Sequence, residues 1–285
     1  MRYSPIIDAT ELLSLLDSDQ LVIIDASNGP EAKTNYLQSH VKGARLVDLD
    51  TQLSNVPVDP ANGGRHPLPA VKTFTQTLGN LGITAGSHVV IYDDKNGSNA
   101  AARFWWMLRA IGHSKVQVLD GGLAAAKRHE LPLRSGEERV KAVEPYPAEK
   151  WLLPISTLEE VQRVSRHASN KIIDVRSNAR YRGIEEPIDA VAGHIPNAVN
   201  IPLSNNLDEQ GYFKDAAELK QMYIASLGDE LASDSIIHCG SGVTACHTLL
   251  AFDYAGLDIP KLYVGSWSEW SSNNLPVARD GSFKP

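Results

Sequence analysis

The second half of the chain is organised around one stretch, Ile236-Ile237-His238-Cys239-Gly240-Ser241-Gly242-Val243-Thr244-Ala245-Cys246. The apolar run that ends at Ile237 indicates a buried parallel strand, and a helical pattern begins near Val243. At such a strand–loop–helix junction, backbone N–H groups point into the loop and the helix dipole adds positive potential there. A thiol in that position is expected to ionise readily, and the thiolate is the nucleophile. Cys239 is therefore predicted to be catalytic.

The composition limits the class of protein. A length of 285 residues suits two domains of roughly 140 residues each. A net charge of −7 argues against a nucleic-acid or acidic-membrane surface. The sequence has no apolar run of ~20 residues and no long apolar segment typical of a signal peptide near Met1. Two cysteines make neither a disulfide framework nor a zinc pattern. We expect a cytosolic protein with no nucleic-acid or membrane partner, no metal and no cofactor.

Two halves of the chain repeat one order of elements. In both halves a short apolar strand is followed by a histidine-containing segment, a helix, a second strand, a loop with a further helix, and a third strand. The corresponding ranges are 21–25, 40–44, 71–81, 88–92, 100–111 and 116–119 in the first half, and 171–174, 193–198, 219–227, 235–238, 243–255 and 262–264 in the second. The repeat indicates a duplicated domain. Alternating strands and helices predict an α/β fold in which each half is a parallel sheet with helices on both faces.

The repeat also predicts which half carries the chemistry. When the two halves are aligned, Asp93 stands where Cys239 stands, and a carboxylate cannot act as the thiolate nucleophile. We therefore expect an inactive domain over residues 1–140, a proline-containing linker over 141–155, and a catalytic domain over 156–285. The inactive domain is expected to help shape the site, since clefts between domains are common ligand sites.

The motifs of the chain resemble those of two-domain rhodaneses. The resemblance is carried by the double repeat, two His-x-x-x-Ala segments at His40 and His194, the loop Cys-Gly-Ser-Gly-Val-Thr-Ala at 239–245, and Trp267-Ser268-Glu269-Trp270. The loop is most similar to that of the 3-mercaptopyruvate sulfurtransferase branch. The resemblance implies tandem rhodanese-like domains and transfer of sulfur from 3-mercaptopyruvate, through a persulfide on the cysteine, to a thiol, cyanide or a thioredoxin-like protein. The alternatives are a thiosulfate:cyanide sulfurtransferase and a persulfide carrier in a sulfur relay.

The resemblance also assigns site residues. It makes Cys239 the nucleophile, gives Ser241 a catalytic hydroxyl, and makes His66 and Asp50 a base oriented by a carboxylate. This relay would help protonate the pyruvate enolate as sulfur leaves. Arg180 would bind the donor carboxylate bidentately. The persulfide would be held by the loop, whose remaining candidate binding residues are Gly240, Gly242, Val243 and Thr244.

One position departs from the pattern of mercaptopyruvate enzymes. Those enzymes often carry a second arginine after a Glu-Pro step, whereas Glu186-Pro187 is followed here by Ile188. Arg182 is close in sequence and is a candidate substitute. The departure keeps thiosulfate as the alternative donor.

The neutral loop separates the rival chemistries. A cysteine phosphatase would need an arginine at the sixth position after the cysteine, but that position is Ala245, and residues 239–245 include no basic side chain. Thiosulfate is a dianion that is usually met by basic loop residues, so the loop favours mercaptopyruvate. A persulfide carrier would not need His66 and Asp50.

Several other side chains have structural interpretations. Arg176 is expected to pair with Asp174, and Ser241 has an alternative role as a helix N-cap. A residue kept in both halves is expected to be structural, and free cysteines usually pack as small apolar groups. The remaining expectations are structural roles for His40 and His194, packing for Cys246, helix packing for Trp105 and Trp106, and a pocket wall for Trp267 and Trp270.

Overall fold

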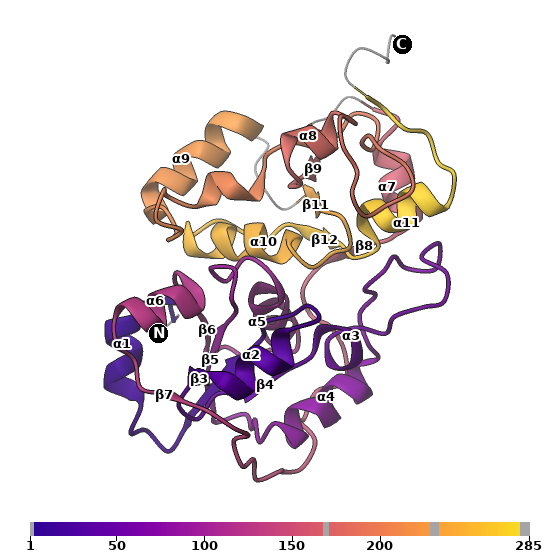
Figure 1. The fold of residues 1–285 in the computed structure, drawn as a ribbon. Coiled ribbons are helices and arrows are strands. Elements are labelled where there is room, and N and C mark those ends of the chain that lie inside the picture. The colour runs from indigo at the N-terminus through magenta and orange to yellow at the C-terminus, as the bar shows by residue number, and fades with distance from the viewer. Residues whose placement is uncertain (1–2, 168–170, 229–233, 280–285) are drawn as a thin grey trace. The chain divides into compact units, whose positions relative to one another are not determined.

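The computed structural model describes residues 3–167, 171–228 and 234–279, and the chain divides into two compact units (Figure 1). The first unit comprises Met1–Asn55, Pro69–Leu153 and Glu209–Phe213, and the second comprises Val56–Leu68, Pro154–Asp208 and Lys214–Pro285. The segment Val56–Leu68 comes from the first half of the sequence but belongs to the second unit. It carries His66, so the predicted relay histidine and Cys239 are parts of one unit.

The first unit is built on a parallel sheet with strand order β1-β6-β5-β2-β4. A short antiparallel pair, β3 with β7, lies beside it. The strands β2 and β5 are almost entirely buried, as expected for parallel strands covered on both faces. The elements of this unit are β1 (Ile6–Ile7), α1 (Ala9–Leu15), β2 (Leu21–Asp25), α2 (Ala32–Gln38), β3 (His40–Val41), β4 (Arg45–Leu46), α3 (Leu49–Gln52), α4 (Val71–Asn80), β5 (His88–Tyr92), α5 (Ala100–Ala110), β6 (Val116–Leu119), α6 (Gly122–Arg128) and β7 (Leu133–Arg134).

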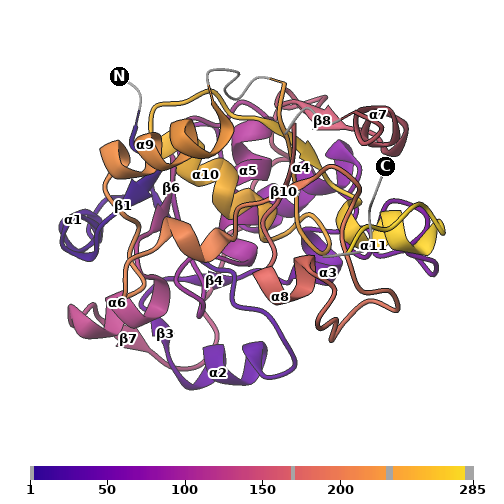
Figure 2. The ribbon, with the colours of Figure 1, turned by 90° about the horizontal axis from the view of Figure 1, so that it is seen from above.

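Helices cover both faces of the first sheet. One apolar cluster joins Leu12 of α1 and Ala126 of α6 to Ile23 and Val90 of the strands. On the other face α4 and α5 pack together, and α5 packs on β5 and β6. Figure 2 shows α1 and α6 on one side of β6 and α5 on the other.

The helix α5 is buried along almost its whole length. Trp105 and Trp106 have no exposed surface, which confirms their predicted packing role.

The second unit repeats the plan with strand order β10-β9-β11-β12-β8, again parallel throughout. Val161 and Trp267 join an apolar cluster with Ile172 and Ile236, which places α7 and α11 on one face, and α10 packs on β11 and β12. The predicted α/β class, with a parallel sheet and packed helices in each half, is thereby confirmed. The elements are β8 (Ile155–Ser156), α7 (Leu158–Val164), β9 (Ile172–Asp174), α8 (Asn178–Tyr181), β10 (Val199–Asn200), the 3-10 helix η1 (Leu203–Asn206), α9 (Ala216–Leu227), β11 (Ile236–His238), α10 (Ala245–Tyr254), β12 (Lys261–Tyr263) and α11 (Ser266–Ser272).

The topology of the second sheet locates the site. The chain leaves β9 towards β10 and leaves β11 towards β12, so the strand order reverses between β9 and β11. Ligands of open parallel sheets bind outside the carboxyl ends of the strands at such a switch point. The register pairs His238 with Asp174 at that edge, and the loop that begins at Cys239 opens there.

Some local expectations were wrong. The chain turns at Asp120 and Gly121 and enters α6 at Gly122, and Trp267 to Trp270 lie within α11. The helix after the cysteine loop begins at Ala245, two residues later than the predicted Val243, because 240–244 form the loop itself. Residues 135–154, which cover most of the predicted linker, form neither helix nor strand.

Across the three described ranges, none of the helices has the length and apolar character needed to cross a membrane.

Candidate active site

Cys239 follows the last residue of β11 and is 1% exposed. Its N–H donates to Ser266 Oγ at 3.2 Å, and its carbonyl accepts the Trp267 N–H at 3.1 Å. Ser266 Oγ in turn donates to the Tyr263 carbonyl at 2.9 Å. Ser266 has φ +54, a left-handed conformation that is uncommon outside glycine. The backbone of Cys239 is thus fixed by the start of α11.

The loop after Cys239 packs closely on the end of β12. Gly242 has φ +73, and a Cβ at this position would lie 2.3 Å from the Val264 carbonyl oxygen. Such a contact excludes any side chain. Glycine is therefore required at residue 242 by the packing of the loop on the end of β12.

Ser241 is paired with His66. The Ser241 Oγ lies 2.8 Å from His66 Nδ1, and Ser241 is buried. Because α10 begins at Ala245 and Thr244 is its cap residue, the alternative role of Ser241 as a helix N-cap is wrong. Two residues that are 175 positions apart in sequence form the predicted hydroxyl–imidazole pair.

The fourth predicted catalytic residue, Asp50, is on α3 in the first unit, and its side chain is exposed. Its part in a relay stays a prediction.

The segment that carries His66 is held by α11. The Gly63 N–H donates to Glu269 Oε1 at 3.0 Å, and the Arg65 N–H donates to Ser268 Oγ at 3.0 Å. Gly64 approaches so closely that a Cβ there would lie 2.3 Å from the Gly265 carbonyl oxygen. The N-terminal turn of α11 therefore positions the His66 segment as well as the cysteine loop.

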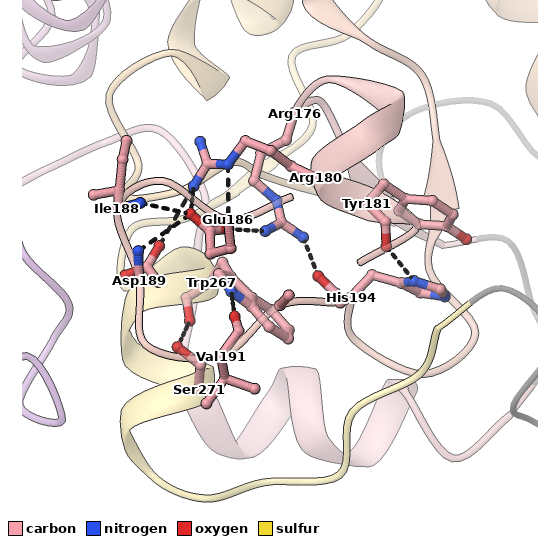
Figure 3. Close-up of polar contacts among 12 residues, drawn as sticks. Arg176, Arg180, Tyr181, Glu186, Ile188, Asp189, Val191, His194, Trp267 and Ser271 are labelled. Atoms are coloured by element: carbon pink, nitrogen blue, oxygen red, sulfur yellow. Dashed lines mark hydrogen bonds and ion pairs between the residues drawn. The ribbon is translucent and has the colours of Figure 1, made fainter. Parts of the chain in front are cut away.

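Glu186 links two arginines near the loop (Figure 3). Arg180 donates to it through Nε at 3.2 Å and through Nη2 at 2.6 Å, and Arg176 Nη1 donates at 3.2 Å. Arg176 also donates to Asp174 from Nη2 at 2.6 Å, which confirms the predicted structural pairing. Burial opposes ionisation of Glu186, but the hydrogen bonds from Arg180 and from backbone N–H groups outweigh it, so the pKa of Glu186 is lowered. Both arginines are held in fixed orientations.

Arg65 is a candidate binding residue that the sequence analysis missed. Its Nη2 lies 3.2 Å from the position of a Cβ built on Gly240, and Arg180 Nη2 lies 3.5 Å from the same point. Arg65 pairs with Asp189, and Arg180 Nη2 lies 3.5 Å from Asp189 Oδ2. Two guanidinium groups therefore lie beside Gly240, the residue after Cys239. The available signal was the position of Arg65 directly before His66.

The other arginine considered for this role is placed differently. Arg182 follows α8 and is exposed, and Ile188 is 60% exposed. The second guanidinium beside Gly240 comes from Arg65 in the segment Val56–Leu68, and not from Arg182.

The histidines shared by the two halves have matching structural environments. His40 stacks on Tyr36 and His194 stacks on Tyr181, with ring centroids 4.0 and 3.7 Å apart. In each pair the histidine Nδ1 lies 2.7 Å from the tyrosine carbonyl oxygen. The prediction that both histidines are structural is confirmed.

The remaining predicted residues fall into two groups. Cys246 is buried on α10 with its Sγ 3.5 Å from the Gly242 carbonyl oxygen, which confirms its packing role. The Arg176 guanidinium lies over the Trp267 ring at 4.7 Å, so this tryptophan supports the arginine network. Val243 is buried and Thr244 is half-buried in the loop, and their binding roles stay predictions.

Among the residues that the structure describes, no group of three or more His, Cys, Asp and Glu side chains could hold a metal ion.

The comparisons with known proteins agree with this geometry. The family model described as the rhodanese-like domain matches residues 8–129 and 157–273. Human 3-mercaptopyruvate sulfurtransferase is 38% identical over 268 residues, covering 90% of this chain and 86% of that protein. Bovine thiosulfate sulfurtransferase is 37% identical over 262 residues, covering 88% and 84%. The solved structure of 3-mercaptopyruvate sulfurtransferase from Leishmania major superimposes with a TM-score of 0.81 at 30% identity, covering 94% of this chain and 74% of that chain. Relatives named for either donor are nearly equally similar, so the donor has to be argued from the site.

Proposed function

Because this chain belongs to the rhodanese-like domain family and is a sulfurtransferase, we propose that it takes sulfur from 3-mercaptopyruvate onto Cys239 as a persulfide. The observation that supports mercaptopyruvate as the donor is the 2.8 Å hydrogen bond between His66 and Ser241. Ser241 is two residues after Cys239 in the sequence. Removal of sulfur from mercaptopyruvate leaves an enolate that must gain a proton. Removal of sulfur from thiosulfate leaves sulfite, which needs none. A hydroxyl held by an imidazole therefore suits mercaptopyruvate.

The proposed first step breaks one C–S bond and forms one S–S bond. The Cys239 thiolate attacks the donor sulfur, and the electron pair of the C–S bond passes into the pyruvate enolate. The His66 Nδ1–H donates to Ser241 Oγ, which leaves the Ser241 hydroxyl hydrogen for the donor carbonyl oxygen as negative charge develops there. The proton that the former donor thiol gives up as the persulfide ionises is the one that the enolate carbon gains, and pyruvate then leaves. Asp50 is the proposed carboxylate partner of this relay.

The donor carboxylate is proposed to bind Arg180 together with Arg65. Guanidinium groups present paired N–H donors that match a carboxylate, and both groups lie beside Gly240. Glu186 fixes the orientation of Arg180, which reduces the entropy lost on binding. The bound carboxylate would direct the thiol-bearing carbon towards Cys239.

In the second step a thiol, cyanide or a reduced thioredoxin-like protein is proposed to attack the outer persulfide sulfur. The S–S bond breaks, the acceptor gains the sulfur, and the Cys239 thiolate is restored. Until then the persulfide anion is held by N–H groups of the loop, where Gly240, Gly242, Val243 and Thr244 are the candidate residues. The cytosolic location and the lack of nucleic-acid and membrane partners stay predictions.

Thiosulfate is the second candidate donor. The observation in its favour is Ile188, which leaves no arginine at the position after Glu186-Pro187. Two guanidinium groups beside Gly240 could also hold the oxygen atoms of thiosulfate. A persulfide carrier is less well supported, because passive transfer does not require the pair of His66 and Ser241.

The test compares both donors on one purified enzyme. Incubation with mercaptopyruvate should release pyruvate and add one sulfur (~32 Da, the atomic mass of sulfur) to the peptide that contains Cys239, as measured by mass spectrometry. The value of kcat/KM should be higher for mercaptopyruvate than for thiosulfate, and equal or reversed values would contradict the choice of donor. Cys239→Ser should abolish transfer from both donors, whereas Cys246→Ser should retain it. Full activity of Cys239→Ser would disprove the persulfide mechanism.

A further inference from the structure

We infer that Asp189 determines donor specificity by setting the net charge of the donor pocket to suit a monoanion. This inference rests on the proposed function, because it concerns the donor that binds beside Cys239. It concerns a residue that contacts the two binding arginines and not the nucleophile.

Asp189 lies where the two binding arginines meet. Its carboxylate pairs with Arg65, and its Oδ2 lies 3.5 Å from Arg180 Nη2. Its side chain is 8% exposed, so solvent screens these contacts only weakly. The Asp189 N–H donates to Glu186 Oε1 at 3.1 Å, and so does the Ile188 N–H at the same distance. The backbone turn around Glu186 therefore fixes the position of Asp189.

The charged side chains of this network balance. It contains three arginines and three carboxylates, which alternate along one chain of contacts and sum to zero. In order along that chain they are Arg65, Asp189, Arg180, Glu186, Arg176 and Asp174. Glu186 and Asp174 are needed to orient Arg180 and Arg176. Asp189 is the carboxylate that contacts Arg65 and Arg180 together, the pair that faces Gly240.

The charge of the pocket discriminates between the two donors. Mercaptopyruvate brings one negative charge on its carboxylate, whereas thiosulfate brings two. Each donor must also approach the negative thiolate of Cys239. With Asp189 ionised, the six side chains of the network sum to zero, so mercaptopyruvate adds one uncompensated negative charge to the pocket and thiosulfate adds two. The second charge is costly in a site where charges interact strongly.

Asp189→Asn should therefore relax specificity. The amide keeps the size of the side chain and an oxygen acceptor for Arg65, but it removes one negative charge. We expect the ratio of kcat/KM for thiosulfate to kcat/KM for mercaptopyruvate to rise about ten-fold, the change typical of one partly buried charge. The change should shrink as salt is added, since salt screens charge and not shape. Asp189→Glu restores the charge and should keep the ratio close to that of the parent enzyme.

A second variant changes the charge of the network in the opposite direction, and its result does not depend on whether Asp189→Asn folds. Arg65→Gln makes the network more negative by one unit and should lower the same ratio, with a greater loss on thiosulfate. The matched control is Glu160→Gln, which removes a carboxylate paired with Lys261 at 2.9 Å. Lys261 is the first residue of β12, whereas Cys239 follows the last residue of the parallel strand β11. The two residues therefore lie at opposite ends of the strands, and this variant should leave the ratio unchanged.

The outcomes separate this inference from the proposed function. If the parent enzyme transfers sulfur from mercaptopyruvate but Asp189→Asn leaves the ratio unchanged or lowers it, the charge role of Asp189 is wrong and the proposed function stands. The same holds if Asp189→Glu behaves like Asp189→Asn, because shape would then decide. If the parent enzyme does not release pyruvate from mercaptopyruvate, the proposed function itself fails.

Discussion

At the scale of single residues, Glu186 holds two arginines and two backbone N–H groups of the site in place. It accepts hydrogen bonds from Arg176 and Arg180 and from the N–H groups of Ile188 and Asp189. Its side chain is 3% exposed, so it would be costly to leave any of these partners unpaired. One carboxylate therefore links Arg180, the proposed donor-binding residue, to the buried pair Arg176–Asp174.

The pH dependence of stability should reveal Glu186. Its folded pKa lies below the ordinary value of 4.5, so its stabilisation is present above pH 4.5 and is lost as the pH falls through the folded value. Glu186→Gln should lower the free energy of unfolding at neutral pH by about 1–3 kcal/mol. It should also flatten the decline of stability below pH 4.5. Urea titrations at several pH values measure both effects. Glu149→Gln, at an exposed position, is the control and should leave the curve unchanged.

His66 should matter more to one donor than to the other. His66→Ala removes the partner of Ser241 Oγ, and general acid–base groups contribute about 10²- to 10⁴-fold to rates. We expect mercaptopyruvate turnover to fall by about 10²-fold and thiosulfate turnover to fall much less, as steady-state assays with each donor will show. His129→Ala, at an exposed position of the first unit, serves as the control. Equal losses on both donors would mean that His66 only supports its loop.

At the scale of elements, the first turn of α11 is the part that joins the two halves of the site. The Ser268 N–H donates to the Gly240 carbonyl at 2.9 Å, while its Oγ accepts the Arg65 N–H at 3.0 Å. The same Oγ donates to the Gly265 carbonyl at 2.9 Å. A single serine thus connects the cysteine loop to the segment of Arg65 and His66.

Ser268→Ala should loosen that connection without unfolding the unit. It removes the acceptor of the Arg65 N–H, a loss of about 1–1.5 kcal/mol, so kcat/KM for mercaptopyruvate should fall about ten-fold. The control is Ser271→Ala on the same helix, whose Oγ donates to the Trp267 carbonyl within the helix at 2.7 Å. If both variants lose activity equally, the integrity of the helix and not the contact with Arg65 is responsible.

The elements also show how far sequence reasoning reaches. The strands β2, β5 and β6 have the predicted bounds, because buried apolar runs end sharply at polar residues or turns. The helices α2, α7 and α8 were not predicted, since they are only 7, 7 and 4 residues long and bury few side chains.

The site shows a similar limit. Cys239, Ser241, His66 and Arg180 follow from the motifs. Arg65 depends on a contact between the segment Val56–Leu68 and residue 189, which no periodic pattern marks.

At the scale of the whole molecule, the two units carry different residues directly after the corresponding strands β5 and β11. In the first unit, Asp93 follows β5 as Cys239 follows β11. Its carboxylate accepts the N–H groups of residues 95, 97, 99 and 101 at 2.8–3.2 Å. Burial raises the pKa of Asp93, and these four donors oppose that shift. These four N–H groups therefore already have an acceptor in the Asp93 carboxylate.

The predicted division of the chain into an inactive domain that ends at residue 140, a linker that ends at residue 155 and a catalytic domain stays a prediction.

A cysteine in place of Asp93 in the first unit should not create a second active site. Asp93→Cys placed in a Cys239→Ser background should show no transfer from either donor. The reason is that Ser27 stands where the second unit has Arg176, so this member of the arginine network is missing from the first unit. The double variant should also be less stable than Cys239→Ser, because N–H groups lose their acceptor. Turnover assays and thermal unfolding measure the two effects, and regained transfer would show that a cysteine in this loop suffices.

The carbonyl oxygen of Val264 beneath Gly242 has a consequence for how this enzyme could diverge. With 2.3 Å between that oxygen and any added Cβ, residue 242 has no tolerance for a larger side chain, and the neighbouring Ala245 has no exposed surface. Substitutions at these loop positions would therefore disrupt packing and be selected against, so they would not widen the site for a larger anion. A change of substrate class would require the end of β12 and the loop to change together. Single mutations reach such a coupled change slowly.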